Sequence, residues 1–213
     1  KNHDDFPYYH FPYSHLLTEY NVLIGIGNFN HGFRTPSSIF YLSSIFYLPL
    51  TKYYLFHLAP VFFLGFSNLI LFRKIKENLD EKENLYLVYL SLFTLIFVNV
   101  FFYRLAEHGT DRTAMILAMI LVIEILFLTN LQKIFEKNEL LKLLILISII
   151  FSLKAFYVIY LILFFVIFIY YEKKRDLLFF LLNNRVFYSC LCLAFIVLFI
   201  NFLNTGCLIY PAK

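Results

Sequence analysis

The sequence predicts an all-α, polytopic membrane protein: a bundle of transmembrane helices preceded by a long loop that contains short interfacial helices. Hydrophobic residues make up 61% of the chain and charged residues only 15%, whereas soluble domains average roughly 45–50% and about 25%. The apolar residues gather in near-continuous runs, several of them close to the length of about 20 residues that a membrane-spanning helix needs. A soluble fold of 213 residues has no core large enough for so much apolar surface.

Residues 1–52 are too polar to span a membrane, and their composition is not biased enough for disorder. The hexapeptide Ser-Ser-Ile-Phe-Tyr-Leu occurs twice in residues 37–48, between two prolines. This pattern predicts a helix of about 12 residues in the membrane interface, with Tyr41 and Tyr47 at headgroup depth. Gly25-Ile26-Gly27 predicts a turn, because a third glycine and an α/β alternation, both typical of a dinucleotide site, are missing.

Residues 53–203 form the predicted transmembrane region. Within residues 140–171, two shorter apolar segments meet at Lys154. A charge at the centre of one long helix would cost about 2.5–3.5 kcal/mol on insertion, whereas a lysine at a helix end can extend to the headgroups. We therefore expect a short hairpin with Lys154 at its tip. The other predicted spans are residues 53–72, 85–103, 113–131 and 186–203.

Most of the 18 Lys and Arg residues fall on one side of this arrangement, including the clusters at 73–76 and 172–175. Because cytoplasmic loops are enriched in Lys and Arg, that side is predicted to face inward. Residues 1–52, the loop 104–112, the Lys154 tip and the tail 204–213 then share the outer face. The sequence starts with Lys1 rather than Met, so we expect a fragment that lacks an upstream membrane helix. It also stops abruptly at Lys213, so we expect the tail 204–213 to be truncated.

Asp4 and Asp5 are adjacent carboxylates near a presumed membrane exit. One hypothesis is that they act as a general base or bind a divalent cation such as Mg²⁺ or Mn²⁺, with His3 as a further candidate ligand. The other is that one of them caps a short helix that begins near Pro7, since Asp is a favoured N-cap. The spacing alone favours the cap or a solvated loop.

The outer loop 104–112 carries five titratable side chains in nine residues. Two arginines on an outer face run against the charge rule, which indicates an anionic partner such as a lipid phosphate. Asp111 or Thr110 could instead cap a helix that starts at Thr113. The five side chains are those of Arg104, Glu107, His108, Asp111 and Arg112.

Glu124 lies inside the predicted third span. An intramembrane carboxylate is a candidate functional group, but it could also pair with Lys154 or another buried donor. The spacing of Cys190 and Cys192 does not match a zinc site.

These residues together resemble the GT-C superfamily of membrane glycosyltransferases, which use sugars carried on polyprenyl phosphate. Residues 4–9 (Asp-Asp-Phe-Pro-Tyr-Tyr) are similar to an acidic pair followed by an aromatic residue in the first outer loop of the dolichyl-phosphate-mannose and aminoarabinose transferase families. Residues 35–42 are similar to the Pro-containing segment that follows, and residues 152–157 to a Thr-Lys-Tyr-like hairpin tip. The pair is Asp-Asp rather than Asp-Glu, and residues 31–36 have no counterpart in the characterised members. Uncharacterised bacterial multi-pass proteins are similar in both loops.

The resemblance implies a transferase of the hexosyl type in the bacterial plasma membrane, with polyprenyl-phosphate-linked sugar as its partner and no nucleic acid. It implies that Asp4 or Asp5 is the catalytic base, with or without a divalent cation. The donor phosphate would be bound by residues of the outer face: Arg34, Arg104, Glu107, His108, Asp111, Arg112 and Lys154. The alternatives are a polymerase, ligase or flippase for a lipid-linked glycan, and a transporter or non-enzymatic membrane subunit.

Overall fold

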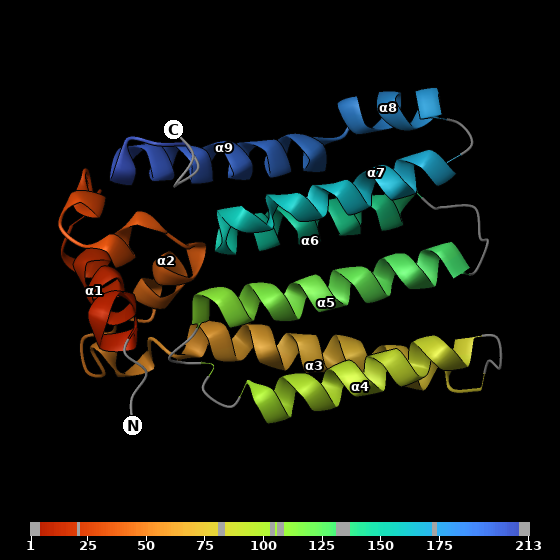
Figure 1. Ribbon diagram of the computed structural model, residues 1–213, viewed down its shortest axis with the longest axis horizontal. Coiled ribbons are helices and arrows are strands. Elements are labelled where there is room, and N and C mark those ends of the chain that lie inside the picture. The colour runs from red at the N-terminus through yellow and green to blue at the C-terminus, as the bar shows by residue number, and fades with distance from the viewer. Residues whose placement is uncertain are drawn as a thin grey trace.

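The computed structural model describes residues 5–20, 22–80, 84–102, 105, 109–130, 137–171 and 174–208. Long helices run side by side along the longest axis, and a cap of short helices covers one end of them (Figure 1). We call this end of the bundle the cap end and the opposite one the far end. No β-strand forms within the described ranges, where the only strand-like pairing is an isolated bridge between Leu48 and Lys52. The all-α prediction is confirmed for these residues.

The cap consists of short helices that begin at residues typical of helix starts. Proline occupies the first turn of each of the first two helices, where its missing N–H costs nothing. The Ser37 hydroxyl accepts a hydrogen bond from the N–H of Ile39 and so caps the helix of the repeated segment. The elements are η1 (Phe6–His10), α1 (Phe11–Glu19), η2 (Ile26–Asn28), η3 (His31–Arg34) and α2 (Ser38–Ile45).

Helix α2 is shorter than the twelve residues predicted, and its tyrosines differ in surroundings. Tyr41 is half-buried and packs against the buried Tyr13, with ring centroids 6.4 Å apart, and its position at headgroup depth stays a prediction. Tyr47 is exposed. The predicted turn at Gly25 is present, with a φ of 68° that favours glycine.

Within the residues that the structure describes, three helices are long and apolar enough to cross a membrane: residues 53–78, 109–129 and 185–205. They are preceded or joined by shorter elements, and α4 has 17 residues. The bundle elements are η4 (Tyr53–Leu55), α3 (Leu58–Asn78), α4 (Leu85–Phe101), α5 (Gly109–Asn130), α6 (Lys137–Leu153), η6 (Ala155–Tyr160), α7 (Leu161–Tyr170), α8 (Lys174–Leu182) and α9 (Arg185–Thr205).

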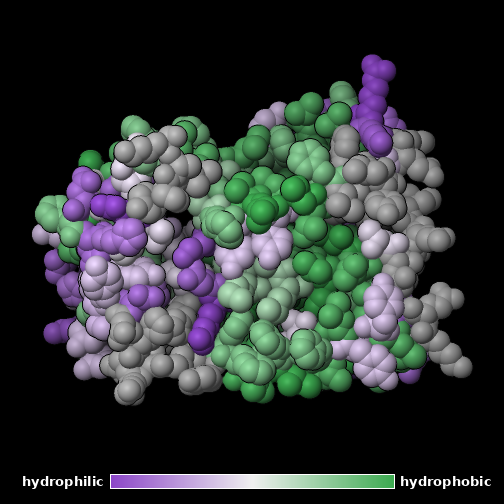
Figure 2. All heavy atoms as spheres, in the orientation of Figure 1, coloured by the Kyte–Doolittle hydropathy of each residue, from purple (hydrophilic) through white to green (hydrophobic). Residues whose placement is uncertain are grey.

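Apolar side chains cover the outside of the bundle. Figure 2 shows hydrophobic residues over its middle and hydrophilic residues gathered on the cap. Phe66 on α3 and Phe195 on α9 are each more than half exposed. A contiguous apolar surface of this kind favours burial in lipid, which agrees with a membrane-associated protein.

Two buried clusters hold the molecule together. One joins the cap to α5 and α6 and includes Tyr13, Phe40, Leu121 and Ile147. The other lies between α3, α4 and α5. Two polar contacts add to the first cluster: the Asn204 amide donates to the Tyr13 hydroxyl over 2.6 Å, and the Ser38 and Ser152 hydroxyls are 3.0 Å apart. The cap is therefore fixed on the ends of α6 and α9.

Glu124 pairs with Lys74 across the α3–α5 interface, with 2.7 Å between Nζ and Oε2. Lys74 was expected in an inner loop, but α3 continues to Asn78 and includes it. Pairing of Glu124 with Lys154 is ruled out in this structure, because Lys154 lies at the cap end and is paired with Asp111. Glu124 is thus neutralised by a neighbouring helix, as the second of the two interpretations predicts.

A candidate functional site at the cap end

Tyr9 is a buried tyrosine of the cap end that lies near two carboxylates. Burial raises the pKa of its phenol, and the carboxylates of Asp5 and Asp111 raise this pKa further because they oppose a third negative charge. The Thr110 hydroxyl acts in the opposite direction on the same pKa. Asp5 and Tyr9 come from the first helix, and Thr110 and Asp111 from the first turn of α5. Residues about one hundred positions apart therefore meet around one phenol.

Asp5 stands at the N-cap position of η1, but its side chain makes no capping hydrogen bond. The simpler interpretation of the acidic pair, a helix cap, is therefore wrong for Asp5. Asp4 lies outside the described residues, as do His3, Arg104, Glu107 and His108, and their predicted roles stay predictions. Among the residues that the structure describes, no three His, Cys, Asp or Glu side chains form a group that could hold a metal ion.

Lys154 joins the cap-end cluster through an ion pair with Asp111. Its backbone is extended between the end of α6 at Leu153 and the start of η6 at Ala155, so the two apolar segments of residues 140–171 are separate helices. Only 24% of the Lys154 side chain is exposed, against 52% for Asp111. The Asp111 carboxylate also acts electrostatically on Tyr157. The tip of the hairpin thus brings one cation and one phenol to the cluster.

The start of α5 differs from the sequence prediction. The helix begins at Gly109 rather than Thr113, so Asp111 lies in its first turn, where a carboxylate is favoured by the helix dipole. Gly109 packs against Pro60, since an added Cβ would be 3.3 Å from that side chain. α3 and α5 therefore approach each other closely at the start of α5.

Arg112 and Arg34 make contacts outside the group formed by Asp5, Asp111 and Lys154. The Arg112 guanidinium lies 5.4 Å from the centroid of the Phe102 ring, and its Nη1 is buried without a hydrogen-bond partner among the described residues. The Nε of Arg34 donates to the carbonyl of Gly27 over 2.9 Å. The structure therefore gathers Asp5, Asp111 and Lys154, and it gives Arg34 a contact within the cap.

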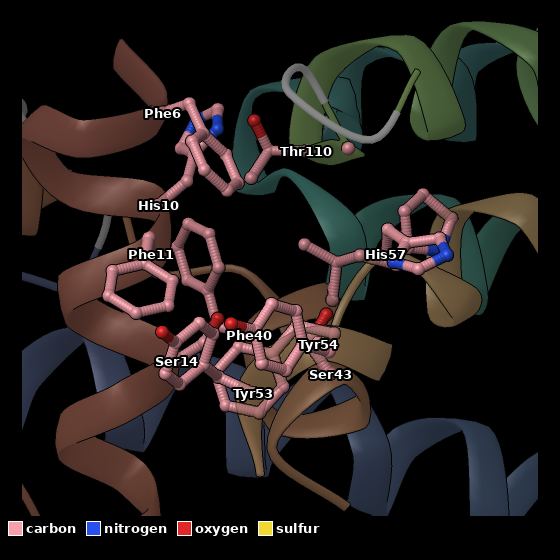
Figure 3. Close-up of a pocket in the computed structure, with 14 residues that line it drawn as sticks. Phe6, His10, Phe11, Ser14, Phe40, Ser43, Tyr53, Tyr54, His57 and Thr110 are labelled. Atoms are coloured by element: carbon pink, nitrogen blue, oxygen red, sulfur yellow. The ribbon is translucent and has the colours of Figure 1, made fainter. Parts of the chain in front are cut away.

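A cavity of about 610 Å³ adjoins this cluster (Figure 3). Phe6, His10 and Thr110 line it, and each is the chain neighbour of a cluster residue. The cavity lies where η1, α1 and α2 meet the starts of α3 and α5, and His10 and Thr110 lie close to each other in its wall (Figure 3). Its aromatic wall is formed by Phe6, Phe11, Phe40, Tyr53, Tyr54 and Phe56.

Sequence reasoning missed Tyr9, Thr110 and the cavity. Tyr9 follows Asp5 by four positions, so one turn of helix brings the two side chains to the same face. That spacing is visible in the sequence, but it points to a site only once Tyr9 is known to be buried within the cap. The cavity depends on how the cap packs on α3 and α5, and local patterns contain no such information.

Comparison with known proteins finds no curated protein and no solved structure that is significantly similar to the chain. The model of one family, described as a domain of unknown function (DUF8201), matches residues 2–213. This match includes the cap, the bundle and every residue of the cap-end cluster. The chain belongs to the DUF8201 family.

Proposed function

We propose that the protein is a multi-pass membrane glycosyltransferase of the hexosyltransferase type, which takes its sugar from a polyprenyl-phosphate donor. In this proposal the cap end faces outward from a bacterial plasma membrane. The sequence resemblance to GT-C enzymes suggested the reaction. The observation that carries the proposal is that Asp111, which is paired with Lys154, and Asp5 both lie near Tyr9 beside a cavity.

The arrangement suits a displacement at a sugar carbon. The carboxylate of Asp5, or of its neighbour Asp4, takes the proton of an acceptor hydroxyl, and the resulting oxygen attacks the anomeric carbon. The bond from that carbon to the phosphate oxygen breaks, and its electron pair stays on the polyprenyl phosphate. Lys154 offsets the negative charge of this leaving group, with Arg104 and Arg112 as further candidates. Between turnovers Asp111 holds Lys154 in position.

The location of the charges favours a transferase over a flippase, polymerase or ligase. A pathway for a charged glycan through the bilayer would need charged groups in mid-membrane. Glu124, the carboxylate predicted in that position, is already paired with Lys74. The polar groups that could act on a substrate therefore lie at the cap end.

The test is sugar transfer from radiolabelled polyprenyl-phosphate hexoses by the full-length protein in proteoliposomes. The variants are Asp4→Asn, Asp5→Asn and the double variant. We expect the single variant that removes the base, and the double variant, to lower the rate about 100-fold or more, as loss of a general base does. Asp80→Asn, an exposed carboxylate at the far end, is the matched control and should keep wild-type transfer. Unchanged transfer in both single variants and in the double variant would refute the catalytic assignment.

Lys154 is tested in the same assay. Lys154→Met keeps the length of the side chain but removes its charge, and we expect a loss of about 100-fold because a leaving group is left uncompensated. The control is Lys142→Met, whose side chain is exposed and paired with Glu139 on the same helix. If Lys154→Met transfers sugar as fast as Lys142→Met, the assignment of Lys154 to the donor phosphate is refuted.

A further inference from the structure

We propose that the cavity beneath the cap binds an uncharged sugar ring, and that the sugar transferred is a neutral hexose rather than an acidic or an amino sugar. This inference rests on the proposed function and adds the chemical class of the transferred group. It depends on three properties of the cavity: its volume, its aromatic wall and the kind of polar side chain that faces it.

The volume of about 610 Å³ lies within the range of roughly 300–1,000 Å³ that small-molecule sites occupy. Aromatic rings line much of the wall, and Tyr53 stacks on Tyr54 with centroids 4.8 Å apart. The face of an aromatic ring carries negative charge density, which attracts the weakly positive C–H bonds on the flat side of a sugar. Rings of this kind therefore suit a pyranose.

The polar groups of the described wall are hydroxyls and imidazoles. None of the described lining residues is Asp, Glu, Lys or Arg. Among these residues a carboxylate or ammonium group on the sugar would find no carboxylate, ammonium or guanidinium of opposite charge, which disfavours its burial there. A hydrocarbon chain would instead leave the polar groups without hydrogen bonds. These groups belong to His10, Ser14, Ser43, His57 and Thr110.

Thr110 gives the cavity a buried hydroxyl. The residue is only 3% exposed, and its hydroxyl lies close enough to the Tyr9 phenol to lower the pKa of that phenol, but it makes no hydrogen bond of good geometry to a described residue. A sugar hydroxyl in the cavity would give it a hydrogen-bond partner. Thr110 also precedes Asp111, the partner of Lys154. A ring bound at Thr110 therefore lies next to the ion pair assigned to the donor phosphate.

The test is the binding of three soluble probes to the wild-type protein in lipid nanodiscs, measured by saturation-transfer NMR. Methyl β-D-glucoside, methyl β-D-glucuronide and methyl β-D-glucosaminide share one ring and differ in charge. We expect the neutral glucoside to bind and the two charged probes to bind at least tenfold more weakly. Equal or tighter binding of a charged probe, or no binding of the glucoside, overturns the inference.

Two variants assign the binding to this cavity. Thr110→Val keeps the shape of the side chain and removes its hydroxyl, and it should weaken glucoside binding about fivefold or more. Thr129→Val makes the same change near the far end of α5, where the hydroxyl bonds to the backbone, and should not weaken it. Equal binding by both variants contradicts the site. Ser43→Ala repeats the test if Thr110→Val does not fold.

The transfer assay separates the inference from the proposed function. If the cavity holds the donor sugar, methyl β-D-glucoside inhibits transfer in competition with the lipid donor. If the glucoside is itself extended, the ring belongs to the acceptor and the donor-sugar assignment fails. Transfer of a charged sugar would support the proposed glycosyltransferase function and refute the inference that the sugar is a neutral hexose. Glucoside binding without transfer from any polyprenyl-phosphate donor would refute the proposed function alone.

Discussion

Replacing Glu124 by Gln removes one half of the ion pair that joins α3 to α5. The two charged atoms are 2.7 Å apart, and only 25% of the Lys74 side chain and 20% of the Glu124 side chain are exposed. The Lys74 ammonium also lies 4.8 Å from the centroid of the Phe127 ring. The variant therefore leaves a lysine with an aromatic contact but without its counter-charge, in helices apolar enough to span a membrane.

The expected cost follows from this degree of burial. Breaking a buried pair by removing one partner costs about 3–5 kcal/mol, whereas an exposed pair contributes about 0.2–1 kcal/mol. With about a quarter or less of each side chain exposed, and with the Phe127 contact retained, we expect a loss of about 2–3 kcal/mol. Since 1.4 kcal/mol is a factor of ten, the unfolding equilibrium should shift roughly 30- to 140-fold.

The assay is unfolding by SDS in mixed micelles for Glu124→Gln, Lys74→Met and the double variant. A double-mutant cycle isolates the pairwise contribution, and we expect a coupling of at least about 1.5 kcal/mol. The control cycle uses Glu139 and Lys142, a pair on one helix with a lysine that is 69% exposed, which should couple by less than about 0.5 kcal/mol. Equal coupling in the two cycles would refute the claim that the Glu124 pair fastens the bundle.

Three further predictions concern the cap-end cluster. Gly32→Ala should cost about 1–3 kcal/mol and lower sugar transfer, because the new Cβ would lie 2.5 Å from the Tyr9 ring; Gly65→Ala, with nothing within 4 Å, should be neutral or stabilising. The raised pKa of Tyr9 adds stability below the ordinary tyrosine pKa of about 10 that is lost at higher pH. Tyr9→Phe should thus lose less stability than wild type or Tyr8→Phe between pH 8 and pH 11 in SDS unfolding. If a divalent cation takes part, EDTA should abolish transfer and Mg²⁺ or Mn²⁺ restore it, and full activity in EDTA would exclude that role.

The helices were predictable from the sequence because length and apolar content decide them. Three of the predicted spans coincide with helices that are long and apolar enough to cross a membrane. The boundaries were less predictable: α5 begins four residues before Thr113, and its first turn packs on Pro60. Helix ends are the part of a helix that sequence patterns define least well.

The candidate site was predictable as a set of residue types and not as a geometry. Charge counting placed Asp5, Asp111 and Lys154 on one face, and the structure brings them to one end of the bundle. No local pattern indicates that Lys154 pairs with Asp111, or that Glu124 pairs with Lys74. Partner choice is fixed by the packing of distant segments, as is the position of the cavity.

The central claim is that the residues assigned to chemistry share the outer face of the membrane. The direct measurement is cysteine labelling in right-side-out vesicles with a membrane-impermeant maleimide, in a background without Cys190, Cys192 and Cys207. We expect Leu50→Cys and Asp111→Cys at the cap end to be labelled from outside, and Asp80→Cys and Asp176→Cys only after the vesicles are permeabilised. Labelling of the two pairs from the same side, or of Leu50→Cys and Asp111→Cys from opposite sides, would contradict the claim.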